Sequence, residues 1–234
     1  MRPAPVLRVA VFAKECLPGR VKTRLTPPLT PDQAADLAQL SLSRTLDTIR
    51  LLPVRERLLV MDGTARARDA AGFAVVAQTG GLLDERLAAF CDEATGPLLI
   101  VGMDTPQMSA VHLAPLLMDW SAATPQHDAW IGAAEDGGFW ALAFRRPDGA
   151  LVRGVPMSTD TTGAEQLSRL AAGGLSVGLL PVLRDMDDMD DAREIAAQIP
   201  GTEFAAAVAA AIEQLQAGGR SDKPEDRAVV SGTA

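Results

Sequence analysis

The stretch FAKECLPGRVKTRL, from Phe12 to Leu25, decides both the fold and the site that we expect. It follows an apolar run, Leu7 to Phe12, that predicts a buried strand. Pro18-Gly19 then signals a turn, so the remainder of the stretch forms a loop after that strand. Because open α/β sheets usually bind ligands at the carboxyl ends of their strands, this loop is the first candidate for a binding site.

Four cations stand close together on this basic loop: Lys14, Arg20, Lys22 and Arg24. The whole chain has a net charge of -8, so the local excess of positive charge is not a consequence of composition. Like charges at this spacing repel one another unless an anion lies among them, which favours a nucleotide phosphate chain as the ligand. Each charge-assisted hydrogen bond to such an anion contributes about 1.5–3 kcal/mol. A solvated basic surface is the alternative, although Val21 and Leu25 indicate a loop that is packed on one side.

Composition limits the classes of function. With 234 residues and 47% hydrophobic content, the chain fits one large domain over residues 1–217. Residues 218–234 are rich in glycine and charge, and we expect them to form a disordered tail. Aromatic residues make up only 4% of an acidic chain, which argues against a nucleic acid polymer or an anionic membrane as a partner. The sequence leaves the oligomeric state open.

The cellular compartment is predicted from what the sequence contains near its start and from its cysteines. We find no signal peptide and no apolar run of membrane-spanning length, so we expect a cytoplasmic protein. Cys16 and Cys91 are far apart in the sequence and form no CxxC motif, which suits free thiols in a reducing compartment. For Cys16, which lies inside the basic loop, we favour a packing role over a catalytic one.

Apolar strands alternate with amphipathic helices along most of the chain. Thr30-Pro31-Asp32-Gln33 is a capping box with proline at the first helical position, and it predicts a helix to about Leu51. Further strands are predicted over 56–61, 73–77, 97–103, 128–134, 139–144 and 175–183, and further helices over 82–94, 109–122, 164–172, 185–198 and 201–216. This order predicts an α/β fold with a mainly parallel sheet covered by helices on both faces, as in a three-layer Rossmann-like domain.

Carboxylates follow two of the predicted strands. Asp104 comes directly after the apolar run 97–103, and the acidic run Asp185 to Asp191 follows the last strand. Mg²⁺ prefers hard oxygen ligands, typically one or two protein carboxylates together with phosphate oxygens and water. A turn role explains Asp104 equally well, and a helix N-terminus explains the later acids of the run. Asp185 and Asp187 precede that helix, and a metal ion would relieve their repulsion.

A third acidic motif, Glu135-Asp136-Gly137-Gly138, separates two predicted strands. Two carboxylates beside two glycines would allow a second substrate to approach closely. Asp-Gly is also a standard hairpin signal, and from the spacing alone the hairpin is slightly favoured.

Taken in order, these motifs resemble a known family. The motifs F-A-K-x-x-x-P-G-x-V-K-T-R-L, G-x-D-x-P, A-E-D-G-G-F and D-x-D-x-x-x-D are similar to those of the bacterial selenodomain-associated transferase family. Its members are assigned to the nucleotide-diphospho-sugar transferase (GT-A) fold, and many are labelled glycosyltransferases. The pattern is more distantly similar to the phospholactate guanylyltransferases and the molybdenum-cofactor guanylyltransferases. The resemblance covers about Val9 to Gln198.

The resemblance implies a role for each motif. Residues of the basic loop would hold the nucleotide phosphates: Lys14, Gly19, Arg20, Lys22, Thr23 and Arg24. Asp104 would bind a divalent metal, Mg²⁺ or Mn²⁺, with Asp187 as the second ligand. The acceptor side would be lined by Glu135, Asp136, Gly137 and Gly138. Lys22, Arg24 and Asp104 would take part in catalysis.

The sequence departs from the family at three places. Leu83-Asp84-Glu85-Arg86 stands where the family often has Leu-Gly-Glu-Arg. Gly132-Ala133-Ala134 and Met157-Ser158-Thr159 replace a Gly-Pro-Ala and a Trp-Ser-Thr segment, and both of these lie on the expected acceptor side. Of the properties implied by the resemblance, the identity of the acceptor is therefore the one least readily carried over from the family to this sequence.

The function implied by the resemblance is that of a Mg²⁺-dependent transferase acting on a nucleotide phosphate. The leading hypothesis is nucleotidyl transfer from an NTP to a phosphorylated small-molecule acceptor, with release of pyrophosphate. The alternative is a glycosyltransferase that uses an NDP-sugar, although sugar transferases of this fold usually show D-x-D where this chain has a single Asp104. A non-catalytic nucleotide-binding protein is a third hypothesis.

Overall fold

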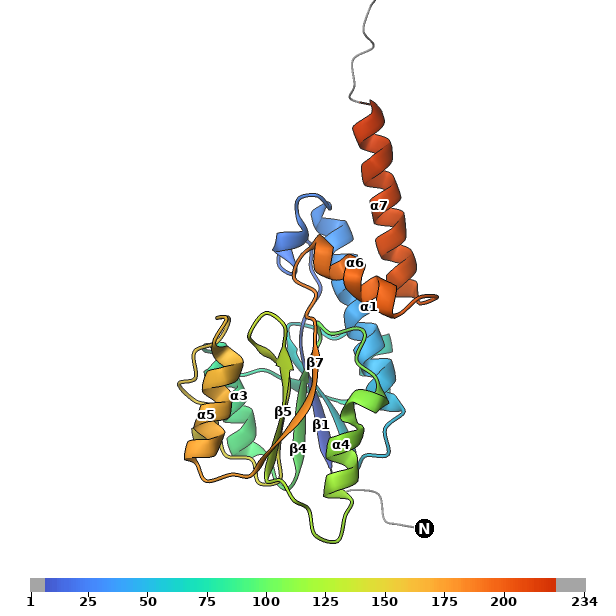
Figure 1. Ribbon diagram of the computed structural model, residues 1–234. Helices are drawn as coiled ribbons and strands as arrows, with labels where there is room; N and C mark the ends of the chain where they lie inside the picture. Colours follow the sequence, from blue (N-terminus) through green and yellow to red (C-terminus); the bar gives the residue numbers. More distant parts are fainter. Residues whose placement is uncertain (1–6, 222–234) are drawn as a thin grey trace, which may run out of the picture.

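The computed structural model describes residues 7–221, which form a three-layer α/β/α domain (Figure 1). The central sheet has strand order β3-β2-β1-β4-β6-β5-β7. Its strands are β1 (Arg8–Lys14), β2 (Glu56–Asp62), β3 (Ala74–Ala77), β4 (Leu98–Gly102), β5 (Ala129–Ala134), β6 (Phe139–Phe144) and β7 (Val177–Leu183). Neighbouring strands pair in parallel except around β6, which is antiparallel to both β4 and β5. The predicted α/β class and mainly parallel sheet are confirmed.

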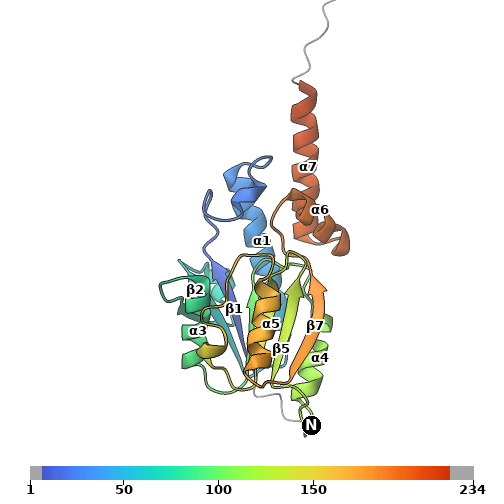
Figure 2. The same ribbon diagram turned by 60° about the vertical axis from the view of Figure 1, so that its left-hand side comes forward.

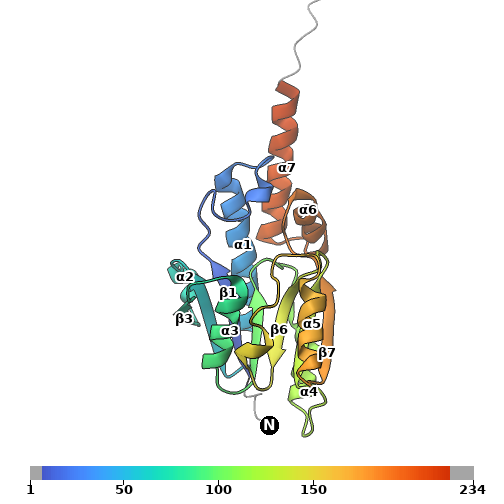
Figure 3. The same ribbon diagram turned by 90° about the vertical axis from the view of Figure 1, so that its left-hand side faces the viewer.

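Helices cover both faces of the sheet. They are α1 (Pro31–Arg50), α2 (Ala67–Ala70), α3 (Leu83–Glu93), α4 (Ala110–Trp120), α5 (Thr162–Ala172), α6 (Met189–Gln198) and α7 (Glu203–Ser221), with short 3-10 turns at η1 (Thr23–Leu25) and η2 (Gly149–Leu151). One core cluster joins α1 and α4 to one face of the sheet, and a second joins α3 to the other face. Figures 2 and 3 show α3 and α5 side by side over this second face.

The helix after the basic loop forms as the sequence predicts. Thr30 Oγ1 accepts a hydrogen bond from Gln33 N at 3.3 Å, and Gln33 Oε1 accepts one from Thr30 N at 2.9 Å. This capping box satisfies two of the free amide groups at the start of α1. The predicted apolar stripe is buried, as Ala38, Leu42 and Leu46 show.

The order of the strands places a switch point at β1. The chain moves outward from β1 through β2 to β3, and then returns to place β4 on the other side of β1. The connections that follow β1 and β4 therefore run toward opposite edges of the sheet, although α1 and α4 cover the same face. The basic loop follows β1 and Asp104 follows β4, so both lie at the carboxyl ends of these neighbouring strands, where folds of this kind usually bind ligands.

A third core cluster fixes the basic loop against the acidic segment that follows β7. It contains Leu25 and Leu29 from the basic-loop side together with Met186 and Met189, and it extends over α6 and α7. Leu25 and Met186 are fully buried. Two segments that are about 160 residues apart in the sequence are thus held beside one another by apolar packing.

Two parts of the structure differ from the simplest reading of the sequence. The short helix α2 was not predicted, because four residues are too few to show a helical period. Helix α7 continues past Gly218 to Ser221, into the stretch expected to be a tail, and the remaining residues 222–234 lie outside the described part of the chain. None of the described helices is long and apolar enough to cross a membrane.

Candidate active site

A cavity of about 720 Å³ opens at the carboxyl ends of β1 and β4. Its walls come from the basic loop, α3, the β4 end, the β5–β6 hairpin, the segment before α5 and the segment after β7. A volume of this size lies in the range of natural small-molecule sites. Predicted site residues that line this cavity are Lys14, Arg20, Lys22, Thr23, Arg24, Asp104, Asp136, Gly138 and Asp187. Gly19 is not among the lining residues, but its φ of +72° allows the turn that aims the loop.

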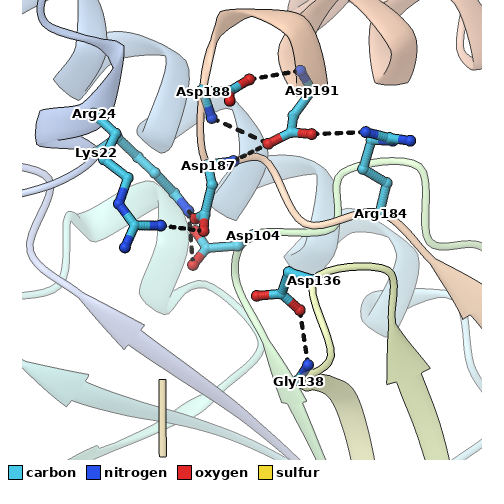
Figure 4. Close-up of polar contacts among 9 residues, drawn as sticks. All are labelled: Lys22, Arg24, Asp104, Asp136, Gly138, Arg184, Asp187, Asp188 and Asp191. Carbon is cyan, nitrogen blue, oxygen red and sulfur yellow. Dashed lines mark hydrogen bonds and ion pairs between the residues drawn. The ribbon is translucent and has the colours of Figure 1, made fainter. Parts of the chain in front are cut away.

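Lys22 lies between two carboxylates at the centre of this cavity. Its Nζ is 3.1 Å from Asp104 Oδ2 and 3.1 Å from Asp187 Oδ1, and the side chain is only 10% exposed (Figure 4). Burial by itself would lower the pKa of the Lys22 ammonium, but the two carboxylates outweigh this effect and raise the pKa above its ordinary value. Lys22 is therefore a permanent positive charge, held where Asp104 and Asp187 approach each other.

The backbone at Lys22 is unusual. Its φ of 46° and ψ of 43° lie in the left-handed region, which a residue with a side chain rarely adopts. Lys22 and Ser158 are the two non-glycine residues with positive φ in the described chain, and both line the cavity. Backbone strain of this kind costs about 1–3 kcal/mol per residue and clusters at functional sites.

Asp187 is held from both sides. Arg24 Nη1 lies 3.1 Å from Asp187 Oδ2, and the Arg24 side chain is 77% exposed, so it remains accessible to a ligand. The main-chain N–H of Asp187 donates to Asp191 Oδ2 at 3.1 Å. Asp191 in turn pairs with Arg184 at 2.9 Å, as Figure 4 shows. The later acids of the run thus have the helix-capping role that the sequence indicated, since Asp188 caps α6.

Asp185 lines the cavity, although the resemblance implied only Asp104 and Asp187 as metal ligands. Its Oδ1 is buried and has no hydrogen-bond partner within the described structure. Burial, with the nearby carboxylates of Asp104 and Asp136, raises the pKa of Asp185 to about 7. A buried acceptor without a partner costs about 1–3 kcal/mol, so this oxygen lacks a cation or a donor.

The donor set at this point suits a hard divalent cation. Asp104, Asp185 and Asp187 offer carboxylate oxygens only, which are the ligands that Mg²⁺ and Mn²⁺ prefer. No group of three or more acidic, His or Cys side chains in the described chain is arranged as a ready-made metal site. Mg²⁺ does not need such a cage, because one or two carboxylates with phosphate oxygens and water are enough. In the described structure, the ammonium of Lys22 contacts both Asp104 and Asp187 and holds these two carboxylates together.

The expected acceptor motif is split by the structure. Residues 135–138 form the hairpin between β5 and β6, as the Asp-Gly signal indicated. Asp136 and Gly138 line the cavity, and Asp136 Oδ1 accepts from Gly138 N at 2.8 Å. Glu135 instead pairs with Arg184 outside the cavity lining. Gly137 packs its backbone against Asp160, where a side chain would clash.

Charge in the cavity is divided between its two sides. Five cationic side chains among the described lining residues come from the first part of the chain: Lys14, Arg20, Lys22, Arg24 and Arg86. Five acidic ones come from later segments: Asp104, Asp136, Asp160, Asp185 and Asp187. The two groups meet at the Lys22–Asp104–Asp187 cluster. One side of the cavity thus suits an anion, and the other suits a cation or a hydroxyl-rich group.

Both cysteines are buried and free. Burial raises the pKa of the Cys16 thiol to about 12, and that of Cys91 to about 12 as well. Neither thiol ionises near neutral pH, which supports the packing role expected for Cys16.

Comparison with solved structures defines the class of fold. A protein from Desulfovibrio desulfuricans G20, provisionally described as a nucleotide-diphospho-sugar transferase, is 23% identical with a TM-score of 0.75, over 92% of this chain and 97% of that chain. A homologue of Rv0371c from Mycobacterium sp. strain JC1 is 18% identical with a TM-score of 0.51, over 82% and 96% of the two chains. The bifunctional IspDF from Campylobacter jejuni is 10% identical with a TM-score of 0.50, over 79% of this chain and 53% of that chain. The fold is therefore that of the nucleotide-diphospho-sugar transferases.

One family model matches part of the chain. The model of the family described as "Uncharacterized protein conserved in bacteria (DUF2064)" matches residues 45–159, just under half of the chain. Together with the solved structures, this match confirms the resemblance indicated by the sequence motifs. No curated protein matches the chain.

Proposed function

We propose that this protein is a metal-dependent transferase that moves a nucleotidyl group from an NTP to a small-molecule acceptor and releases pyrophosphate. The observation that carries the proposal is the position of Lys22. Its ammonium lies 3.1 Å from both Asp104 and Asp187, at the switch point of a nucleotide-diphospho-sugar transferase fold. A cation suited to binding phosphate and two carboxylates suited to binding a metal, from three distant segments of the chain, thus lie in contact with one another.

The basic loop would bind the phosphate chain. Lys14, Arg20 and Thr23 face the same cavity as Lys22 and Arg24, and all are donors to phosphate oxygens. In the reaction, an acceptor oxygen forms a bond to the α-phosphorus while the α–β phosphoanhydride bond breaks. Lys22 and Arg24 would neutralise the negative charge that builds on the departing pyrophosphate. Catalysis would rest on positioning and charge stabilisation, and a phosphorylated acceptor needs no protein base.

Asp104 and Asp187 would hold the divalent metal, with Asp185 beside them. A divalent metal held there, Mg²⁺ or Mn²⁺, would supply positive charge that neutralises the phosphate oxygens. For the metal to bind, the Lys22 side chain must move away from the two carboxylates, and its ammonium would then contact the phosphate chain. Phosphate oxygens would then replace the two carboxylates as the partners of this ammonium.

A second candidate is glycosyl transfer from an NDP-sugar to a hydroxyl acceptor. It is favoured by the acceptor side of the cavity, where Asp136 and Asp160 lie near the hydroxyl side chains of Ser158 and Thr159. No cation from the described residues after Arg86 lines the cavity, so a phosphorylated acceptor would meet like charge there. In this reaction the bond from the anomeric carbon to the phosphate breaks, a new bond to the acceptor oxygen forms, and a carboxylate such as Asp136 would take the hydroxyl proton.

One set of incubations tests both candidates. The protein is mixed with Mg²⁺ and each NTP or NDP-sugar, and thermal stabilisation and released pyrophosphate or NDP are measured. Stabilisation by triphosphates with pyrophosphate release supports nucleotidyl transfer, and NDP release from an NDP-sugar supports glycosyl transfer. Stabilisation without turnover by any donor indicates a nucleotide-binding protein, and no stabilisation by any nucleotide refutes the proposal. Arg24→Ala, which we expect to keep the fold and lose turnover, is measured beside the wild type.

A further inference from the structure

One part of the cavity is not used by the phosphate or metal groups. Its wall lies on the face of the sheet that α3 covers (Figure 3). The wall is apolar, and its residues Phe12, Ile100 and Leu87 belong to one core cluster. Leu83 and Phe139 extend the same wall. An apolar wall beside a phosphate-binding loop suits a flat ring, which loses water on its faces and keeps polar atoms at its edge.

Arg86 is the charged side chain at this wall. It lies three residues after Leu83 on α3, and Leu87 lies four residues after Leu83, so both are neighbours of Leu83 on the helix surface. All three line the cavity, and the Arg86 side chain is 14% exposed. The polar group at this end of the cavity is thus carried by a rigid helix.

Gln78 fixes the orientation of Arg86. Its Nε2 donates to the main-chain oxygens of Ala13 at 2.9 Å and Val60 at 3.0 Å, which leaves Oε1 as the acceptor that faces Arg86. Arg86 Nη1 donates to this Oε1 at 2.6 Å. Gln78 itself lines the cavity, so the guanidinium is presented there by a residue that is anchored to β1 and β2.

The guanidinium of Arg86 has unused donors. Its Nε is buried without a hydrogen-bond partner and is closed to a ligand, whereas Nη2 makes no hydrogen bond within the described residues and remains accessible. Asp62 Oδ2 lies 3.6 Å from Nη1, and because the Asp62 side chain is 55% exposed, it balances only part of the positive charge. A neutral oxygen acceptor can satisfy a free donor of this guanidinium.

We propose that Arg86 selects the nucleobase, and that the protein prefers bases with a carbonyl at this edge, guanine or uracil, over adenine and cytosine. A carbonyl oxygen accepts from the guanidinium, whereas the amino group that adenine and cytosine carry at the equivalent position is a donor and cannot pair with it. The inference rests on the proposed function, because it takes the phosphates to lie on the basic loop. It names the class of nucleotide that this site binds.

Calorimetric titration with GDP, UDP, ADP and CDP in Mg²⁺ tests the inference, because diphosphates bind without nucleotidyl transfer. For the wild-type protein, we expect at least one of GDP and UDP to bind about tenfold or more tightly than either ADP or CDP. In Arg86→Gln, whose amide both donates and accepts, this preference should fall to within about threefold. Arg86→Lys, which keeps a donor, should retain the direction of the preference, and Arg193→Gln, an exposed arginine outside the cavity, should leave it unchanged.

Two results would overturn the inference. One is a wild-type protein that binds ADP or CDP as tightly as GDP and UDP. The other is an Arg86→Gln variant that weakens all four diphosphates by the same factor, which would mean that Arg86 only supports the wall. If Arg86→Gln does not fold, the wild-type ranking and Arg86→Lys still decide. Failure of the proposed function looks different: either no diphosphate binds the wild-type protein, or diphosphates bind but no NTP yields pyrophosphate.

Discussion

Replacing Lys22 by methionine tests the centre of the site most sharply. The substitution keeps a long side chain and removes the ammonium that lies 3.1 Å from Asp104 and 3.1 Å from Asp187. At this distance, each pair gains about 5 kcal/mol of Coulomb energy at an effective dielectric constant of about 20. Desolvation of the ammonium offsets most of this, and the two carboxylates remain 38% and 36% exposed. We therefore expect a net loss of about 1–3 kcal/mol in the free energy of unfolding.

The same variant should bind metal better. Without the ammonium, two carboxylates face each other beside Asp185, and their repulsion favours uptake of a divalent cation. A loss of about 1–3 kcal/mol corresponds to a fall of about 2–12 °C in melting temperature in metal-free buffer. Added Mn²⁺ should restore much of this loss in Lys22→Met and have little effect on the wild-type protein, because binding to the folded state alone stabilises it.

The assay is thermal unfolding with and without Mn²⁺, together with Mn²⁺ binding followed by electron paramagnetic resonance in the absence of nucleotide. Lys14→Met is the matched control, since Lys14 lines the same cavity and forms no ion pair with any described residue. We expect Lys22→Met to bind Mn²⁺ about tenfold more tightly than the wild type, and Lys14→Met to match the wild type. The reasoning is refuted if Lys22→Met is as stable as the wild type in metal-free buffer and gains no affinity for Mn²⁺.

Three further predictions concern neighbouring residues. Arg24→Ala should lower turnover by about a hundredfold or more, because it removes a cation that stabilises the departing phosphate. The free energy of unfolding should change by less than about 1 kcal/mol, because the Arg24 side chain is 77% exposed. Full activity of the variant, measured by product release, would remove Arg24 from the site. Because the pKa of Asp185 is raised to about 7 from an unfolded value of about 4, its folded state holds the proton more tightly, so stability in metal-free buffer should fall as pH rises from about 4 to 7. Asp185→Asn should flatten this slope in melting temperature against pH, and an unchanged slope, with Asp160→Asn as control, would contradict the assignment. Glu135→Gln should keep turnover within about twofold and lower the free energy of unfolding by less than about 1 kcal/mol, because Glu135 pairs with Arg184 outside the cavity. Asp136→Asn, which changes a residue of the cavity lining, should lower turnover about tenfold. Equal effects of the two variants on turnover would mean that both residues serve the acceptor.

Local patterns made much of the fold predictable. Periodicity and capping signals act over a few residues, and the capping box at Thr30 and the hairpin at Asp136 formed as expected. The basic loop and Asp104 were identified because each follows an apolar strand, and the ends of parallel strands meet at one edge of a sheet. These features depend on neighbours in the sequence, so one sequence was enough to find them.

The details of the site depend on distant segments and could not be predicted in the same way. The insertion of Lys22 between Asp104 and Asp187 requires the core around Leu25 and Met186, which joins segments about 160 residues apart. The surroundings of Asp185 and the ion pair of Glu135 with Arg184 depend on the position of β7 at the edge of the sheet, because Asp185 and Arg184 directly follow this strand. Arg86 belongs to the segment Leu83-Asp84-Glu85-Arg86, which differs from the family pattern, but its direction into the cavity depends on its contact with Gln78.

Calorimetric titration of a nucleoside triphosphate with and without Mg²⁺ tests the central claim most directly, because the claim is that loop cations and distant carboxylates bind one metal–phosphate unit. The account predicts that the wild-type protein binds the triphosphate about tenfold or more tightly in Mg²⁺ than in EDTA, and that Asp104→Asn loses this gain while its affinity in EDTA is kept. Equal affinity of the wild-type protein in Mg²⁺ and in EDTA would contradict it.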